Sequence, residues 1–285
     1  MGRGLSLAAF VGLQILMMLH HERNLFAGHT ARLNRAPALL MAANPVFSTQ
    51  GLYFIAMLPE GYRETSVAKG GSYTRSGHSD HLAITAAKER IWVEESSKTS
   101  SVLELSTHTG SNNISASDAE APVASADSLS LAYFRQDHGR SRIWLRSLRS
   151  LSDDSRAITP ADLNVLEMAF LPNGILTFSA VHHGGTELYF VNQKGAIFDS
   201  GIRNVRYPAA SPDGERLAYS RLERGTWNLW IRQLSTSREI RVTNQDCNDL
   251  SPTWLDDSKT LVYASVCGRG LWLTALEEKR VLPSE

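Results

Sequence analysis

The sequence has few cysteines and no excess of charge of either sign. Of its 285 residues only two are cysteine, and 29 basic residues match 29 acidic residues, so the formal net charge is zero. Proteins that bind nucleic acids need a basic patch, and no block of like charge is present here. The composition therefore argues against a nucleic-acid partner.

Motifs that carry catalysis or bind metals are also scarce. The G-x-S-x-G nucleophile elbow of propeller-linked hydrolases does not occur anywhere in the chain. The histidine clusters after the N-terminal region are His78-Ser79-Asp80-His81 and His182-His183, and zinc needs three or four converging ligands. We interpret the first cluster as a loop and the second as an exposed hairpin tip. The sequence thus predicts no catalytic residue, no metal site and no cofactor.

What the sequence does contain is a unit of short strands, seen best from Tyr207 to Leu234. Ser211-Pro212-Asp213-Gly214 is typical of a type I β-turn, because serine can bond the backbone, proline pre-sets φ and glycine suits the fourth position. The apolar runs Leu217–Ser220 and Leu229–Leu234 follow, separated by the polar turn Glu223-Arg224-Gly225. With its flanking segments, the unit predicts four strands in up-and-down order.

This unit recurs with a period of about 40 residues. Pro208 has counterparts at Pro252, 44 residues later, and at Pro122, 86 residues earlier. Weaker copies place markers at residues 45, 82 and 168, so successive spacings are 37, 40, 46, 40 and 44. The third strands of the clearest copies carry tryptophans that we interpret as packing between the units: Trp144, Trp230 and Trp272.

Radial repetition of small sheets produces a β-propeller, so these units predict an all-β, six-bladed propeller. The alternative is a β-sandwich with chance similarity, which would not repeat the same order of turn, strand and tryptophan. The repeats resemble the TolB-like propeller family, a relative of the WD-type repeats. The resemblance covers residues 45–285, is clearest in the second half, and implies six blades and an extracytoplasmic location. The residues that carry it are Pro208, Ser211-Pro212-Asp213-Gly214, Leu217-Ala218-Tyr219, Asn228-Leu229-Trp230-Ile231 and Arg241-Val242-Thr243.

The N-terminal region differs from the repeats. Leu5–Leu19 is a largely apolar run of 15 residues that follows Arg3 and ends at His20. A signal peptide needs a small-residue cleavage site close by, and the first such triplet is Ala36-Pro37-Ala38; a membrane-spanning helix needs about 20 residues. We predict that residues 1–40 form a hydrophobic anchor helix and linker, and that residues 41–285 form the propeller. A cleaved signal peptide, the last helix of a larger membrane protein and a buried core helix remain alternatives.

The two cysteines bear on the location of the propeller. If Trp254 faces Leu261 in the last unit, paired residue numbers sum to 515, and Cys247 and Cys267 sum to 514. We therefore predict a disulfide between them, against the alternative of two unrelated buried thiols. Disulfides persist in oxidising compartments, which favours a periplasmic propeller, whereas the arginines that follow the apolar run favour a cytoplasmic one.

Two functions from different classes are consistent with these features. We expect a non-catalytic, membrane-tethered interaction module of the cell envelope that binds a protein, peptide or glycan through its loops. The alternative is a lyase or hydrolase acting on a polymer at one propeller face, or an accessory or sensor domain of a larger membrane protein. The segments expected to line the channel argue against catalysis there, because they hold no carboxylate pair and no ring of histidines: residues 45–47, 82–84, 122–124, 168–170, 208–210 and 252–254.

Overall fold

The structure is a computed structural model, and its regular elements are all β-strands, so the all-β prediction is confirmed. Within the part of the chain that it describes, no helix is long and apolar enough to cross a membrane. The apolar run Leu5–Leu19 lies outside that part, so the predicted anchor is not described. The described residues are 30–32, 41–48, 51–58, 61–67, 73–75, 81–87, 90–96, 99–107, 110–115, 119–148, 154–244, 246–266 and 270–275.

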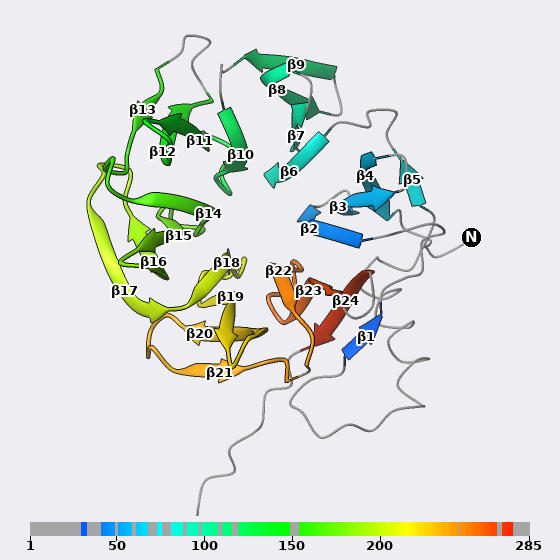
Figure 1. Ribbon diagram of the computed structural model, residues 1–285. Coiled ribbons are helices and arrows are strands. Elements are labelled where there is room, and N and C mark those ends of the chain that lie inside the picture. The colour runs from blue at the N-terminus through cyan, green and yellow to red at the C-terminus, as the bar shows by residue number, and fades with distance from the viewer. Residues whose placement is uncertain are drawn as a thin grey trace, which may run out of the picture.

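The described strands pair into six four-stranded antiparallel sheets, arranged as blades around a central opening (Figure 1). Within a blade the strands follow one another in chain order from the centre outward. Blade I contains β2 (Met41–Ser48), β3 (Gly51–Leu58), β4 (Gly61–Val67) and β5 (Tyr73–Arg75); blade II contains β6 (His81–Ala87), β7 (Arg90–Ser96), β8 (Thr99–Thr107) and β9 (Gly110–Ser115); blade III contains β10 (Ala119–Ala124), β11 (Ser130–Asp137), β12 (Arg140–Ser147) and β13 (Arg156–Ala157); blade IV contains β14 (Asn164–Phe170), β15 (Leu176–His182), β16 (Gly185–Val191) and β17 (Ile197–Arg203); blade V contains β18 (Val205–Ala210), β19 (Arg216–Glu223), β20 (Thr226–Gln233) and β21 (Glu239–Arg241); blade VI contains β22 (Asp249–Trp254), β23 (Thr260–Ser265) and β24 (Gly270–Ala275).

Blade VI takes its fourth strand from the other end of the chain. The strand β1 (Thr30–Arg32) pairs with β24, so the sheet joins the N-terminal part to the C-terminal part. From the sequence, Thr30–Arg32 are predicted to belong to the linker, because three residues carry no periodic signal that would mark a strand. In the structure this segment belongs to the ring, and it joins the two ends of the chain in one blade.

Each well-marked inner strand bulges just before its marker proline. In β18, Arg206 pairs with Ser220 and Ala209 with Ala218, so two residues of β18 face one of β19. The extra residue is Tyr207, whose φ is +55°, and Ala121 and Ser251 have similar values at the same position of β10 and β22. Such bulges twist a strand and re-aim its side chains. They turn the inner strands of successive blades in the same way around the opening.

The hydrophobic core lies between blades. One cluster joins Leu188 and Ile202 of blade IV to Leu217 and Tyr219 of blade V. Tyr219 is fully buried, as are Tyr133 of blade III and Tyr263 of blade VI at the matching positions of their second strands. Burying an aromatic side chain of this size contributes about 2 to 3 kcal/mol, so these seams hold neighbouring blades together.

The turn Ser211-Pro212-Asp213-Gly214 has the geometry that its residues favour. The amide of Gly214 donates to the carbonyl of Ser211 over 2.9 Å, and Gly214 has a φ of +73°, which glycine adopts without strain. The Ser211 hydroxyl accepts from the amide of Arg216 over 2.9 Å. The same i to i+3 bond closes the matching turns Ser125–Ser128, Leu171–Gly174 and Leu255–Ser258.

Candidate binding face

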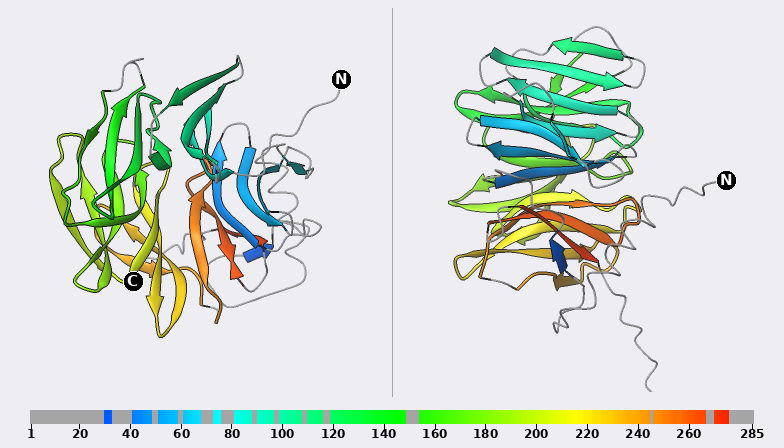
Figure 2. Two further views of the ribbon diagram at one scale, coloured as in Figure 1. Left: turned by 45° about the horizontal axis from the view of Figure 1, so that its top comes forward. Right: turned by 90° about the vertical axis from the view of Figure 1, so that its right-hand side faces the viewer.

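The ring has two faces of different construction, and the strands run from one face to the other (Figure 2). We call the upper face the one that carries the turns between second and third strands and the connections between blades. The lower face carries the turns between first and second strands, such as Ser211–Gly214. Three described upper-face turns have two central residues with positive φ: His138-Gly139, His183-Gly184 and Arg224-Gly225. As predicted, His183 is an exposed residue at a hairpin tip.

Asparagines join neighbouring blades at the upper face. The Asn248 side-chain oxygen accepts from the backbone amide of Trp227 in the preceding blade over 3.0 Å. Asn164 does the same for the amide of Ser141 over 2.9 Å. Because these bonds fix the connection of one blade to the third strand of the blade before it, the upper face is a rigid platform.

Three apolar side chains stand exposed at matching positions of this platform. Val181, Leu222 and Val266 each follow the buried aromatic of a second strand by three residues, and they are 39%, 37% and 52% exposed. We call these three residues the upper patch. Side chains alternate along a strand, so Leu222 shares a side with Ala218, which packs against Trp254 of blade VI. The residues of the upper patch therefore lie where successive blades meet at the upper face.

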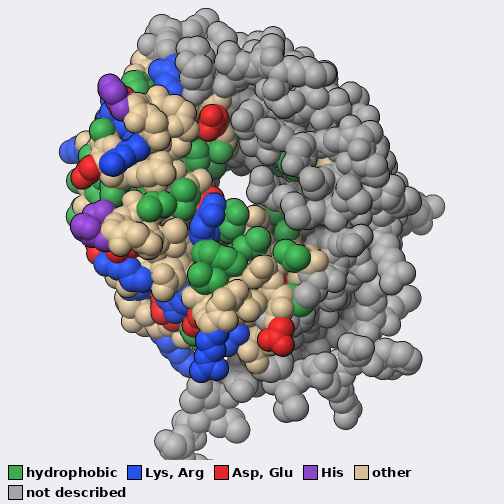
Figure 3. Space-filling model, in the orientation of Figure 1, with side chains coloured by type: hydrophobic (Ala, Val, Ile, Leu, Met, Phe, Trp, Pro, Cys, Tyr) green, Lys and Arg blue, Asp and Glu red, His purple; other side chains and the backbone are tan. Residues whose placement is uncertain are grey.

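A second feature lies nearer the opening, on the inner strands. One oxygen of Glu167 in β14 accepts from Arg206 in β18, with Nε at 2.6 Å and Nη2 as a second donor. The other oxygen accepts from the hydroxyl of Ser179 and from the amide of Tyr207. We call Glu167, Ser179, Arg206 and Tyr207 the inner cluster. Figure 3 shows basic and hydrophobic side chains around the central opening.

Electrostatics keep Arg206 charged in the inner cluster. Burial alone would lower the pKa of Arg206, but the hydrogen bonds and the charge of Glu167 raise it above its ordinary value. Burial raises the pKa of Tyr207, whose ring centroid lies 5.0 Å from the Arg206 guanidinium carbon. The side chain of Arg206 remains 33% exposed, against 16% for Glu167. The cluster thus links blades IV and V while leaving one cation partly open to solvent.

The sequence does not predict the inner cluster, because the predicted channel segments start later than the strands. Those segments are residues 168–170 and 208–210, whereas β14 begins at Asn164 and β18 at Val205. Glu167 and Tyr207 stand one residue before those segments. Spacing from the markers does not reveal these residues, because the bulge residue stands one position before the marker in β18 and two positions before it in β14.

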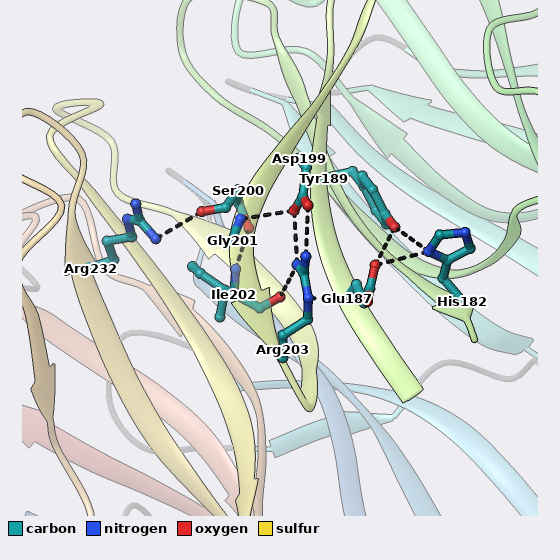
Figure 4. Close-up of polar contacts among 9 residues, drawn as sticks. All are labelled: His182, Glu187, Tyr189, Asp199, Ser200, Gly201, Ile202, Arg203 and Arg232. Carbon is teal, nitrogen blue, oxygen red and sulfur yellow. Dashed lines mark hydrogen bonds and ion pairs between the residues drawn. The ribbon is translucent and has the colours of Figure 1, made fainter. Parts of the chain in front are cut away.

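A third group of polar side chains lies at the outer rim of blade IV (Figure 4). One oxygen of Glu187 accepts from the Tyr189 hydroxyl and contacts Nδ1 of His182 at 3.1 Å. Its other oxygen lies 3.1 Å from Nε of Arg203, and Arg203 in turn donates two hydrogen bonds to Asp199 at 2.7 and 2.8 Å. We call these five residues the rim cluster.

The rim cluster holds its carboxylates in the ionised form. The hydrogen bond from Tyr189 holds the pKa of Glu187 below its ordinary value, and the hydrogen bonds from Arg203 lower the pKa of Asp199 to about 2. The pKa of Tyr189 is raised by burial and by Glu187. Both carboxylates are therefore charged at neutral pH. They lie on the side of blade IV opposite to Val181, because Glu187 pairs with Ala180 while Val181 pairs with Thr186.

Two of the three repeated tryptophans have described side chains. Trp230 packs against the cluster that joins Leu188 of blade IV to Leu217 of blade V. Trp144 packs against Leu131 within blade III. An arginine covers each indole, with guanidinium carbons 4.9 Å from the Trp144 ring centroid and 4.7 Å from that of Trp230. The side chain of Trp272 lies outside the described residues.

Cys247 is disulfide-bonded. Its predicted partner Cys267, the other cysteine of the chain, lies outside the described residues, so the pairing stays a prediction. The predicted register is confirmed, since Trp254 pairs with Leu261; beyond the bulge Asp249 pairs with Ser265, and these numbers sum to 514.

Metal-binding side chains do not gather in the part of the chain that the structure describes. No group of three or more His, Cys, Asp or Glu residues there could hold a metal ion. The pair His182-His183 has ring centroids 3.9 Å apart, and His182 turns its Nδ1 toward Glu187 within the rim cluster.

Comparison with known proteins supports the fold. No family model matches the sequence. TolB from Acinetobacter baumannii is similar in structure, with a TM-score of 0.64 and 16% identity, over 94% of this chain and 69% of that one. The chain has a TolB-like β-propeller fold.

Other β-propellers are also similar in structure. Oligogalacturonate lyase from Vibrio parahaemolyticus matches with a TM-score of 0.61 and 8% identity, over 87% of this chain and 94% of that one. The β-propeller domain of the Trilobed protease from Pyrococcus furiosus matches with a TM-score of 0.55 and 11% identity, over 81% and 79%. Identities this low establish a shared fold and leave function to be argued from the TolB-like propeller's own residues.

Proposed function

We propose that this chain is a non-catalytic interaction module of the cell envelope that binds a protein or peptide through its upper face. The ring would comprise six blades closed by β1, with the propeller outside the cytoplasm and tethered by the N-terminal apolar run. The observation that carries the proposal is the upper patch. Exposed apolar groups beside charged side chains are typical of protein interfaces, in which an apolar centre is surrounded by a polar rim.

The geometry of the upper patch favours a macromolecular partner over a small ligand. Its three residues belong to three successive blades, so a partner that contacts all of them must cross two seams. The partly exposed Arg206 lies toward the opening, on the inner strand of blade V. A partner with apolar anchors and a few acceptors for arginine fits this surface best.

The experiment compares two charge insertions at apolar residues of similar exposure. Leu222 is 37% exposed on the upper face, and Ile240 is 43% exposed on the outer strand β21. Leu222→Asp and Ile240→Asp proteins, and the unchanged protein, are used to capture partners from cell-envelope extracts after crosslinking. We expect Leu222→Asp to lower capture of a specific partner about tenfold, equivalent to about 1.4 kcal/mol, and Ile240→Asp to leave it unchanged.

Equal capture by all three proteins would contradict the choice of face. If Ile240→Asp lowers capture and Leu222→Asp does not, the interface lies on the outer strands and not on the upper face. If a glycan is captured and no protein is, the upper face remains the binding face, but the partner is a glycan. Thermal unfolding of each variant shows whether the fold is intact.

The alternative is an enzyme acting on a polymer, and the inner cluster is the observation that favours it. The cluster brings a carboxylate, an arginine and a tyrosine together on the inner strands, and the similar structures include an oligogalacturonate lyase. Against this, both oxygens of Glu167 already accept hydrogen bonds from Ser179, Arg206 and Tyr207. Lyase and hydrolase assays on polysaccharides, with and without divalent cations, test the alternative. If Glu167→Gln abolishes an activity that Glu187→Gln preserves, the protein is an enzyme and the proposal of a non-catalytic interaction module is wrong.

The proposed extracytoplasmic location is supported by the disulfide at Cys247. We expect the full chain, isolated from its native cells without reductant, to resist thiol alkylation until it is reduced. Cys247→Ser should then expose one reactive thiol, at Cys267. Two alkylated thiols in the unreduced native protein would contradict both the predicted pairing and the argument for an oxidising compartment.

A further inference from the structure

The chain enters the ring from the lower face. Thr30, the first residue of β1, pairs with Thr274 in β24. The next residue of β24, Ala275, pairs with Thr260, which follows the lower-face turn Leu255–Ser258. β1 therefore runs from the lower face toward the upper face, and the chain that precedes it arrives at the lower face.

The reach of the preceding segment is limited. Ten residues separate the apolar run Leu5–Leu19 from Thr30. Such a segment spans at most about 35 Å when fully extended, and a flexible chain of this length has a typical end-to-end distance of about 17 Å. A seven-residue strand such as β16 is about 23 Å long. The segment would have to be almost fully extended to pass the height of the ring and place the upper face against a membrane.

The two faces carry different exposed side chains. Of the five exposed large hydrophobic side chains among the described residues, three form the upper patch, whereas Phe198 and Ile240 lie on outer strands, with Phe198 shortly after the lower-face turn Asn192–Gly195. The lower-face turns carry both acidic and basic residues: Asp127, Asp213, Asp257, Lys194 and Lys259. The lower face is therefore mixed in charge, and the path of β1 is the observation that gives the direction.

We propose that the tether holds the propeller with its lower face toward the membrane and presents the upper patch to partners on the side away from it. This inference rests on the proposed function, since it assumes the N-terminal tether and the upper binding face. It adds an orientation, and with it the class of partner: one that approaches from the aqueous compartment and not from within the same bilayer.

The test measures the distance of each face from a bilayer. The full chain is reconstituted into phosphatidylcholine vesicles that contain an acceptor-labelled lipid. A donor dye is attached through a non-natural amino acid at exposed position Glu215, on the lower face, or Arg224, on the upper face, so that the disulfide stays intact. Because the two sites are separated by the length of a strand, about 26 Å, we expect energy transfer from position 215 to be at least about twofold higher.

Each outcome decides a different point. Equal transfer from both positions, or more from position 224, would overturn the orientation while leaving the tether intact. Transfer from neither position would show that the N-terminal run does not tether the protein, and the orientation would then be wrong as well. The Leu13→Arg variant is the control, because it gives the signal expected without a tether. Leu222→Asp should preserve the transfer difference while losing partner capture, which separates failure of the orientation from failure of the binding face.

Discussion

Single residues decide how well neighbouring blades hold together around the opening. Glu167 and Arg206 come from inner strands and are 39 residues apart in sequence, and their hydrogen bonds join blade IV to blade V. Asp249 shows the opposite case, since it occupies a position where β10, β14 and β18 have Ala119, Val165 and Val205. We therefore expect neutralisation to have opposite effects on stability at the two residues. It should destabilise the fold at the ion-paired Glu167 and stabilise it at the buried Asp249.

Neutralising the inner cluster should destabilise the ring. We expect Glu167→Gln to lower the free energy of unfolding by about 2 kcal/mol, because Arg206 loses a charged acceptor while two thirds of its side chain is shielded. Urea unfolding measures the loss, with the exposed lower-face variant Glu215→Gln as the control. Combining Glu167→Gln with Arg206→Met should show a coupling of at least about 1 kcal/mol, and strict additivity would mean that the pair does not interact.

Neutralising Asp249 should have the opposite sign. Asp249 is 1% exposed, and its Oδ2 has no hydrogen-bond partner among the described residues. Burial raises its pKa above the ordinary value, against hydrogen bonds from Ser265 and Thr243 that lower it. A folded-state pKa above the unfolded value means that the folded state binds the proton more tightly. Stability from this group is therefore fully present below the unfolded pKa of 3.8 and is lost as pH rises through the folded pKa.

Asp249→Asn removes that dependence. We expect it to raise the free energy of unfolding at pH 7 by about 1 kcal/mol and to flatten the stability profile above pH 4. Chemical denaturation at a series of pH values checks both, and Asp246→Asn, an exposed neighbour, should change neither. A destabilised Asp249→Asn protein at pH 7 would show that the buried carboxylate has a favourable partner.

At the scale of elements, the sequence predicts what local chemistry determines. Ser211–Gly214 and the apolar run from Leu217 are found as a turn and a strand, because glycine, proline and short apolar runs limit the local choices. The register of Trp254 opposite Leu261 follows from the matching turn Leu255–Ser258 of blade VI. The short strand β1 and the bulges depend on partners distant in sequence, so the inner cluster and the closing strand could not be read from spacing alone.

The connections between blades are elements whose strength can be measured. Asn248 joins blade VI to the amide of Trp227 in blade V, and removing the acceptor should cost about 1 kcal/mol. We expect Asn248→Ala to accelerate hydrogen exchange at that amide and to lower the urea midpoint. Asn244→Ala, an exposed neighbour, is the control. Unchanged exchange at Trp227 would mean that the platform is held together by other contacts.

At the scale of the whole molecule, the proposal gives the two faces different roles. The strand β1 begins near the lower face, and the lower-face turn at Ser211 is closed by its own serine and aspartate side chains. The upper face combines asparagine connections with the upper patch, whose residues come from three successive blades. The rim cluster lies at the outer rim of one of these, blade IV. A ring built in this way can be tethered on one side and bind on the other without changing shape.

Hydrogen–deuterium exchange of the propeller with its captured partner tests the central claim most directly. The account predicts slowed exchange in peptides that cover the upper-face segments 181–186 and 222–227, with the lower-face turns at 211–214 and 255–258 unchanged. Protection confined to those lower-face turns, or to the outer strands β17 and β21, would contradict the assignment of the upper face as the binding surface.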